Sequence, residues 1–311
     1  MTSVTRCFFI ISLLFCTASA ALAAPPVPLV ALGDFTGACG GTLICNGDAA
    51  EIGTTLRLVP SLPGQSGAAY LAKAIPLSAG GGFVSAFTFR LSGNGDAMRA
   101  DGLAFLLARD PTSLGDPSRY GGSMGFEGVN NSFAVEFDVF DNGNEVGGSN
   151  HIALDRNGVL SDTAAASPFG QSACNTATVG ANCMSNGSLW TGIIGYNGHD
   201  HEISVAVVNG NGDIDLVIDA APANLDDLLG GTGVYAGFGA GTGDGRLNHD
   251  LNAWALVLGN PNLRDHNARK WMTSAQDGPI VETPEPASAT LLALGLAALA
   301  GTKRRRRPAR K

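Results

Sequence analysis

The sequence predicts an all-β protein built as a sandwich or barrel, and three observations support this fold class. The chain of 311 residues contains 43 glycines, which suits frequent tight turns better than helices. Helical periodicity is nearly absent, whereas short apolar-polar alternations recur. In one such run Phe87, Phe89 and Leu91 alternate with Thr88 and Arg90, as expected of a strand with one buried face.

Segments with a strand pattern follow one another along the chain with no helix expected between them. They cover residues 56–59, 83–91, 102–108, 132–140, 151–154, 201–209, 214–219, 234–240 and 253–256. Asn209-Gly210-Asn211-Gly212 joins two of them and has the residues of a hairpin turn, because Asn and Gly tolerate positive φ. The stretch from Asp155 to Leu189, rich in Ser, Ala, Asn and Gly, predicts a surface loop.

Residues 1–24 have the pattern of a secretory signal peptide. Arg6 precedes an apolar run from Cys7 to Cys16, and small residues follow up to a predicted cleavage after Ala24. The apolar run is shorter than the roughly 20 residues that a membrane-spanning helix needs. We therefore expect an exported protein.

The last residues form a second targeting pattern. Pro284-Glu285-Pro286 precedes an apolar stretch, residues 287–301, and then a basic cluster that includes residues 303–307. Basic clusters of this kind stay cytoplasmic. The order resembles the PEP-CTERM sorting signal of Gram-negative bacteria that produce exopolysaccharide. The resemblance implies a short transmembrane helix within residues 284–311, a sorting protease as partner, and a final place in the cell envelope, on the outer surface or in the extracellular matrix. An ordinary C-terminal membrane tail is the alternative.

Between the two ends the sequence predicts one β-sandwich domain, residues 25–260, and a linker, residues 261–283. Removing Arg6 and seven basic tail residues leaves 11 of the 19 Lys and Arg, and removing Glu285 leaves 26 of the 27 acidic residues, so this region carries about −15. Such a surface disfavours nucleic acid, whose phosphates require a basic face. Divalent cations and neutral glycans remain as partners.

Four cysteines follow the predicted cleavage point. An even number in an exported protein predicts disulfides, and the short spacings favour Cys39 with Cys45 and Cys174 with Cys183 over the other two pairings. No Cys-x-x-Cys motif occurs.

The densest polar cluster begins at Glu136 and Asp138, which lie two residues apart on one predicted strand and so project from the same face. Two neighbouring carboxylates repel each other unless a cation lies between them. Oxygen ligands select calcium, and here they would come from Asp138, the Phe140 carbonyl, Asn142 and Glu145. His151 would join Glu136 and Asp138 at a second site for manganese or another transition ion. The alternative is a solvated acidic turn.

Three segments resemble the legume-lectin family of the concanavalin A-like superfamily. They are residues 100–105, residues 121–126 leading into 133–140, and residues 235–238 followed by Asn248-His249-Asp250 and Trp254. The resemblance implies a jelly-roll β-sandwich that binds carbohydrate, with glycans or exopolysaccharide as partners and a possible homo-oligomer.

The resemblance also implies a sugar site. Asp101, which would follow a cis peptide bond, would accept hydrogen bonds from two sugar hydroxyls. The Asn142 side chain and a backbone N–H of the Gly121-Gly122 loop would each donate a hydrogen bond to the sugar. The Phe140 ring would contact a sugar face, and Gly243, Asp244 and Gly245 would tune which sugar fits. One departure is Val146, which stands where the family has an aspartate that bridges both metals, so calcium is expected more firmly than a second ion.

Two other functions compete with a lectin. Glu136, Asp138 and Asp141 approach the Glu-x-Asp-x-x-Glu motif of laminarinase-type glycoside hydrolases, but the aspartate at 141 is one methylene shorter than the glutamate of the motif. A structural matrix domain that binds no glycan is the other alternative. We expect a protein without enzymatic activity.

Overall fold

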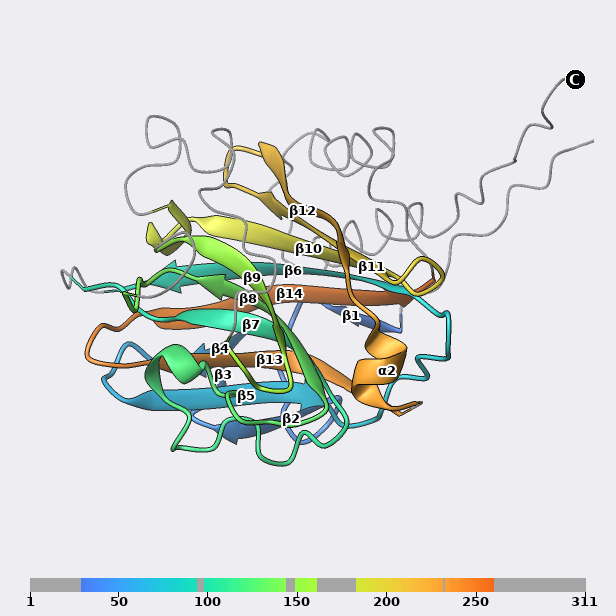
Figure 1. Ribbon diagram of the computed structural model, residues 1–311. Helices are drawn as coiled ribbons and strands as arrows, with labels where there is room; N and C mark the ends of the chain where they lie inside the picture. The colour runs from blue at the N-terminus through green and yellow to red at the C-terminus, as the bar shows by residue number, and fades with distance from the viewer. Residues whose placement is uncertain (1–28, 94–97, 144–148, 161–182, 232, 260–311) are drawn as a thin grey trace, which may run out of the picture.

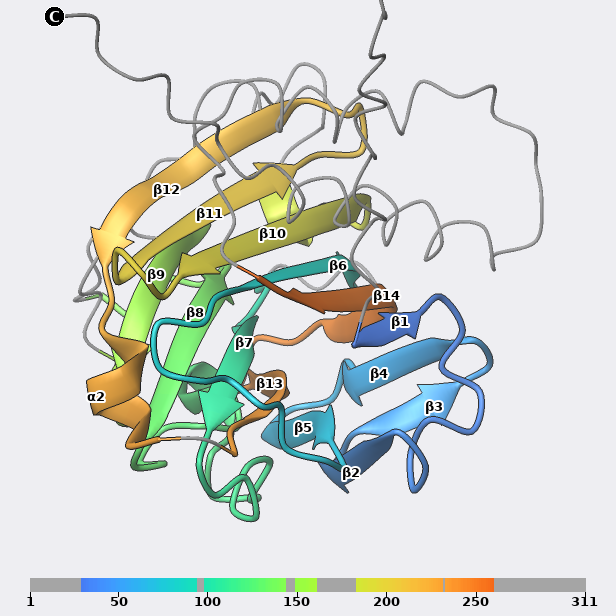
Figure 2. The ribbon, with the colours of Figure 1, turned by 90° about the vertical axis from the view of Figure 1, so that its right-hand side faces the viewer.

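The computed structural model describes residues 29–93, 98–143, 149–160, 183–231 and 233–259 (Figure 1). The predicted signal peptide, linker and sorting signal lie outside these residues. The described chain forms two antiparallel sheets that pack face to face (Figure 2). Among the described residues, no helix is long and apolar enough to span a membrane.

The larger sheet has eight strands. Along it lie β12 (Ile214–Pro222), β11 (Glu202–Val208), β10 (Leu189–Asn197), β6 (Phe83–Ser92), β14 (Asn248–Leu258), β4 (Thr55–Val59) and β3 (Ala50–Ile52), and β1 (Val30–Leu32) pairs with β14. The smaller sheet has six strands in the order β2 (Leu43–Gly47), β5 (Gln65–Leu71), β13 (Tyr235–Thr242), β7 (Gly102–Ala108), β8 (Ser132–Asp138) and β9 (His151–Arg156).

Three short helices complete the described elements: η1 (Gly121–Ser123), η2 (Cys183–Ser185) and α2 (Leu225–Leu229). The Asn224 side chain caps α2 by accepting a hydrogen bond from the Asp227 N–H at 3.2 Å. The sequence pattern missed this helix, because five residues are too few to show helical periodicity.

An aromatic cluster joins the two sheets. The centroid of the Phe87 ring on β6 lies 4.8 Å from the ring centroid of Phe238 and 5.3 Å from that of Phe137, and both of these residues are on the six-stranded sheet. Trp254 of β14 packs 5.0 Å from Phe238, and its indole N–H donates to the buried Ser85 hydroxyl at 3.0 Å. Each aromatic pair contributes about 0.5–1.5 kcal/mol beyond the area it buries, so the cluster fixes the two layers against each other.

All the predicted strands are present; β7 has the predicted ends, residues 102–108, and the others differ at one or both ends. The segment predicted as 132–140 ends earlier, at Asp138, and 253–256 is the centre of the longer β14. The predicted hairpin joins β11 to β12. The predicted loop from Asp155 to Leu189 is wrong at both ends, because β9 continues to Arg156 and β10 begins at Leu189.

Two longer strands, β5 and β10, were missed because glycines interrupt their apolar pattern. A Cβ on Gly192 of β10 would lie 2.6 Å from the Phe87 ring, and a Cβ on Gly67 of β5 would lie 1.9 Å from the Leu58 carbonyl oxygen. Both glycines are required for close packing within the sandwich.

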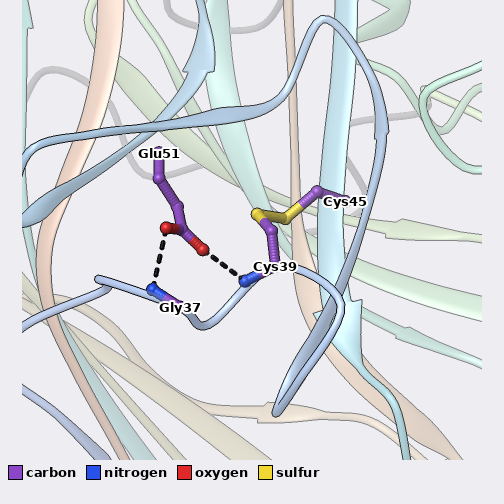
Figure 3. The surroundings of a disulfide bond; sticks show 4 residues. All are labelled: Gly37, Cys39, Cys45 and Glu51. Atoms are coloured by element: carbon purple, nitrogen blue, oxygen red, sulfur yellow. Dashed lines mark hydrogen bonds between the residues drawn. A yellow bond between two sulfur atoms is a disulfide. The ribbon is translucent and has the colours of Figure 1, made fainter.

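The structure confirms the predicted disulfide between Cys39 and Cys45 (Figure 3). Beside it the Glu51 carboxylate accepts hydrogen bonds from the N–H groups of Gly37 at 2.8 Å and Cys39 at 2.6 Å. Cys183 is also disulfide-bonded. Its predicted partner, Cys174, lies outside the described residues.

Candidate functional site

Three segments that are far apart in the sequence meet at one edge of the six-stranded sheet. This edge is formed by the ends of the strands, where β7 begins and β8 and β13 end. Gly102 at the start of β7 pairs with Asp138 at the end of β8 and with Gly241 near the end of β13. Because neighbouring strands run antiparallel, the chain before β7 and the chains after β8 and β13 leave the sheet at the same edge.

Helix η1 brings a fourth segment to this edge. A Cβ on Gly241 would lie 2.3 Å from the Gly121 carbonyl oxygen, so the backbone of η1 packs directly against β13. Gly121 has φ +63°, which favours glycine. Four separate segments therefore surround one position.

Asp101 occupies the centre of this edge. The Ala100–Asp101 peptide bond is cis, as the family resemblance implied. The Asp101 N–H donates to the Gly241 carbonyl at 3.2 Å, and the Asp101 carbonyl accepts from the Val139 N–H at 2.9 Å. These two hydrogen bonds hold the Asp101 backbone between β13 and the segment that follows β8, and Asp101 is only 4% exposed.

Glycines face the Asp101 carboxylate from two loops. Asp101 Oδ2 lies 3.5 Å from the position of a Cβ on Gly243 and 3.8 Å from that of a Cβ on Gly121. The Gly121 and Gly243 backbones are themselves adjacent, with 3.7 Å between the Gly121 Cβ position and Gly243 Cα. Side chains on these two residues would fill the space in front of the carboxylate.

Asn142 approaches from the segment after β8. Its Nδ2 lies 2.9 Å from the position of a Cβ on Gly122, and Asn142 itself is exposed. Asp101, Gly121, Gly122, Asn142 and Gly243, five of the residues predicted to bind a sugar, thus lie close together.

The other predicted sugar-site residues have different positions. Asp244 is exposed at the tip of its loop, whereas Gly245 is buried, and a Cβ there would lie 2.7 Å from the Ala100 Cβ. Phe140 is half-buried and its N–H donates to Asp138 Oδ1 at 2.6 Å. Gly245 therefore packs against Ala100, the residue before Asp101, and the chain turns between Asp138 and Phe140.

Three of the predicted metal ligands, Glu136, Asp138 and His151, lie on strands of the six-stranded sheet. Glu136 and Asp138 are 3% and 2% exposed, and both project from the face of β8 opposite to Phe137. His151 of β9 is fully buried, pairs in register with Asp138, and its Nε2 lies 3.1 Å from Glu136 Oε1. The three side chains therefore lie on one face of two neighbouring strands.

The predicted calcium ligands after β8 are oxygen donors, the atom type that calcium prefers. The Asp138 carboxylate, the Phe140 carbonyl and the Asn142 amide follow one another along one short segment and offer oxygen ligands. Glu145, the fourth predicted ligand, and Val146 lie outside the described residues. Within the described ranges, no three His, Cys, Asp or Glu side chains form a group that could hold a metal.

Sequence reasoning missed the segment that supports the Gly243 loop. The Gly64 N–H donates to the Gly243 carbonyl at 3.1 Å, and the Thr242 hydroxyl donates to the Leu62 carbonyl at 2.6 Å. Leu62-Pro63-Gly64 is a turn signal in the sequence, but nothing local indicates its contact with Gly243.

Comparison with a family model and with known sequences gives matches to lectins in both cases. A family model described as the legume lectin domain matches residues 34–272. The chain is 32% identical over 201 residues to a putative bark agglutinin of Robinia pseudoacacia, covering 62% of this chain and 66% of that protein. It is 28% identical over 204 residues to a galactose-binding lectin of Arachis hypogaea, covering 62% of this chain and 67% of that lectin. The chain thus spans about two thirds of the length of these relatives.

A similar solved structure is a seed lectin of Lotus tetragonolobus. Its TM-score is 0.58 at 25% sequence identity, and the superposition covers 70% of this chain and 93% of the lectin. The likeness extends over nearly the whole lectin fold.

Proposed function

The chain belongs to the legume lectin family of non-enzymatic carbohydrate-binding proteins, and from this premise we propose that it is an exported, calcium-dependent lectin. The proposed ligand is a neutral sugar at the end of a glycan or exopolysaccharide. The observation that carries the proposal is the position of the Asp101 carboxylate, which faces Gly121 and Gly243 where the four segments meet.

The chemistry of these groups suits a pair of adjacent sugar hydroxyls. A carboxylate is an acceptor with two oxygens, so Asp101 accepts one hydrogen bond from each hydroxyl. The Asn142 amide and a backbone N–H of Gly121 or Gly122 donate to sugar oxygens. Because Gly121, Gly122 and Gly243 carry no side chains, they would leave room for a sugar ring beside these donors.

Specificity is assigned to residues at the edge of the site. The half-buried Phe140 presents its ring to an apolar face of the sugar, and the loop of Gly243, Asp244 and Gly245 limits which hydroxyl orientations fit. The exposed Asp244 is the one side chain of that loop able to contact a ligand, because its two neighbours are glycines.

Calcium is proposed as the ion bound beside the sugar site. Asp138, the Phe140 carbonyl and Asn142 would hold it, together with Glu145. A bound calcium would order the segment after β8 and thereby hold Asn142 against Gly122. The expected second site for a transition ion at Glu136, Asp138 and His151 is not proposed, because these three described side chains do not form a group that could hold a metal.

The glycoside hydrolase is not proposed. The family is non-enzymatic, and Asp141 is an exposed residue whose carboxylate accepts from the Gly143 N–H at 2.7 Å. Glu136 is buried beside His151 within the sheet. A glycan-free matrix role remains as an outcome of the test below.

The test is a glycan array followed by calorimetric titration of the full chain, with galactose as the first sugar because a relative is named for binding it. We expect binding that is lost after chelation and restored by calcium, and a calcium-dependent rise in thermal stability. Binding that persists without metal would remove calcium from the proposal. No binding to any glycan in calcium would favour the matrix role, and product release from β-glucan would favour the hydrolase.

Export is proposed from residues 1–24 and 284–311. Cell fractionation of the full chain and of a Glu285→Ala variant tests it. We expect the full chain outside the cytoplasm, and a change in its distribution when the Pro-Glu-Pro pattern is altered. Full chain retained in the cytoplasm would contradict export.

A further inference from the structure

The eight-stranded sheet has an apolar patch on the face that points away from the sandwich core. Along β6, Phe83, Phe87 and Phe89 enter the core, so Val84 and Ala86 point outward. The outward patch consists of Val84, Ala86, Ile193, Ala206, Val208, Ala255 and Val257, with the half-buried Ile214 and Leu216 beside it.

This outward patch is buried. Val84 is 0% exposed, and Ile193 and Val208 are each 3% exposed. Every residue of the cluster belongs to β6, β10, β11, β12 or β14, so the cluster does not include the layer that covers it. Outward side chains of a two-layer sandwich face solvent unless a further segment lies over them. A covering segment is therefore required.

We propose that residues 260–272 form this cover and that Leu263, Trp271 and Met272 pack on the outward patch. The described chain ends at the patch: Val257 of β14 pairs with Val84, and the Gly259 N–H donates to the Gly82 carbonyl at 2.8 Å. The next residue is Asn260, so the segment starts beside the surface that it would cover.

The family match supports treating this segment as part of the domain. The legume lectin model matches through residue 272, beyond the last described strand, β14, which ends at Leu258. The predicted linker would then be shortened to residues 273–283, and the sorting tail would leave from the eight-stranded sheet, whereas the proposed sugar site lies at the edge of the six-stranded sheet.

The composition of the segment suits the surface. It has Leu263, Trp271 and Met272 as large apolar residues, and three basic residues against the single acidic Asp265. The region between the predicted signal and sorting peptides is strongly acidic, so the segment and the domain have complementary charge.

The segment is long enough to cross the patch. Twelve residues in extended form span up to roughly 40 Å. The patch extends from β14 across β6, β10 and β11 to β12, and four strand spacings amount to roughly 19 Å. Trp271 can therefore reach any residue of the outward patch.

Other segments of the chain are weaker candidates. Predicted signal cleavage leaves only residues 25–28 before Leu29, and residues 161–182 are mainly small and polar, with Phe169 as their single aromatic residue. A second copy of the chain is the remaining competitor, and the experiment distinguishes it.

Trp271 is a direct reporter of the cover. The other two tryptophans, Trp190 and Trp254, are 1% and 0% exposed, so acrylamide quenching of fluorescence depends on Trp271. In the full chain we expect weak quenching that does not depend on protein concentration. Ile193→Asp on the patch should release Trp271 and raise its quenching several-fold with an unchanged far-UV circular dichroism spectrum. Trp271→Phe should leave only the weakly quenched core emission.

Two further variants keep the test decisive. Thr88→Asp places a charge on the same outward face but outside the apolar cluster and should leave the quenching of Trp271 low. Leu263→Asp changes the segment and leaves the sheet intact, so it should expose Trp271 even if Ile193→Asp fails to fold. Quenching in the native chain as strong as in a peptide of residues 260–283 would overturn the proposal. So would protection that appears only as the chain dimerises, since a second copy would then cover the patch.

Discussion

The Asp101 carboxylate faces Gly243 across the candidate site, with Oδ2 3.5 Å from where a Cβ on Gly243 would lie. The two residues come from the segment before β7 and the loop after β13, and the pairing of Gly102 with Gly241 holds these segments together. The proposed sugar site rests on this approach of glycine backbone to a buried carboxylate, which yields the first two predictions.

Gly243→Leu should abolish sugar binding without unfolding the protein. The first added carbon meets only ordinary contacts, whereas the rest of the leucine side chain would fill the space in front of Asp101. Gly243→Ala, which adds one carbon, should weaken binding much less. Titration calorimetry measures both affinities, and equal affinities for the leucine variant and the native chain would place the sugar elsewhere.

Asp101→Asn should lower sugar affinity at least about tenfold, because each hydrogen bond to a charged group is worth about 1.5–3 kcal/mol and asparagine replaces one acceptor with a donor. The exposed Asp244 is the matched control, and Asp244→Asn should alter sugar preference more than overall affinity. A glycan array run on both variants checks this. The reverse pattern would show that the Gly243–Gly245 loop, and not Asp101, holds the sugar.

Gly122→Ala should reduce binding by displacing Asn142. The new Cβ would lie 2.9 Å from Asn142 Nδ2, which is too close, so the amide must move away from the site. Gly210→Ala is the control, since its Cβ would lie no closer than 3.5 Å to its neighbours in the β11–β12 turn. Affinity measured for the two alanine variants should fall only for the first.

His249 should make the protein less stable in acid. Burial lowers the pKa of His249 to about 3, although the hydrogen bond from its Nδ1 to the Leu247 carbonyl favours the protonated form. Within the described part of the chain its Nε2 has no hydrogen-bond partner. The unfolded chain, with a histidine pKa near 6.5, therefore binds this proton more readily than the folded protein.

The free energy of unfolding should consequently fall as the pH drops from about 6.5 to about 3, by up to roughly 1.4 kcal/mol per pH unit from this residue. Urea unfolding at several pH values measures the slope. A His249→Gln variant, which cannot titrate there, should show a shallower slope. Identical slopes in the two proteins would mean that His249 is accessible to protons in the folded state.

Loss of the Cys39–Cys45 disulfide should affect stability but not binding. The bond closes a loop with a sequence separation of 6, and loop-closure entropy assigns about 2 kcal/mol to a ring of this size. A variant with both cysteines changed to alanine should unfold at lower urea concentration with unchanged sugar affinity. Lost affinity would show that the region around β2 supports the site.

Local patterns in the sequence were sufficient for the fold class and most strands. Side chains alternate between the two faces of a strand, so the alternation at Phe87, Phe89 and Leu91 is visible without any partner strand. The pattern fails where packing demands glycine, as at Gly67 and Gly192, because the close approach that excludes a Cβ involves residues far away in the chain.

The sequence alone determined a glycine-rich all-β chain, an even cysteine count and a family motif that identified Asp101, Gly121, Gly122, Asn142 and Gly243 as one set. Only the tertiary structure decided that Asp101 faces Gly243, that Asn142 lies against Gly122, and that the apolar residues on the outer face of the eight-stranded sheet form one buried patch. The physical reason is that strand pairing and register create these contacts between distant segments, whereas sequence periodicity reports only the environment of neighbouring residues.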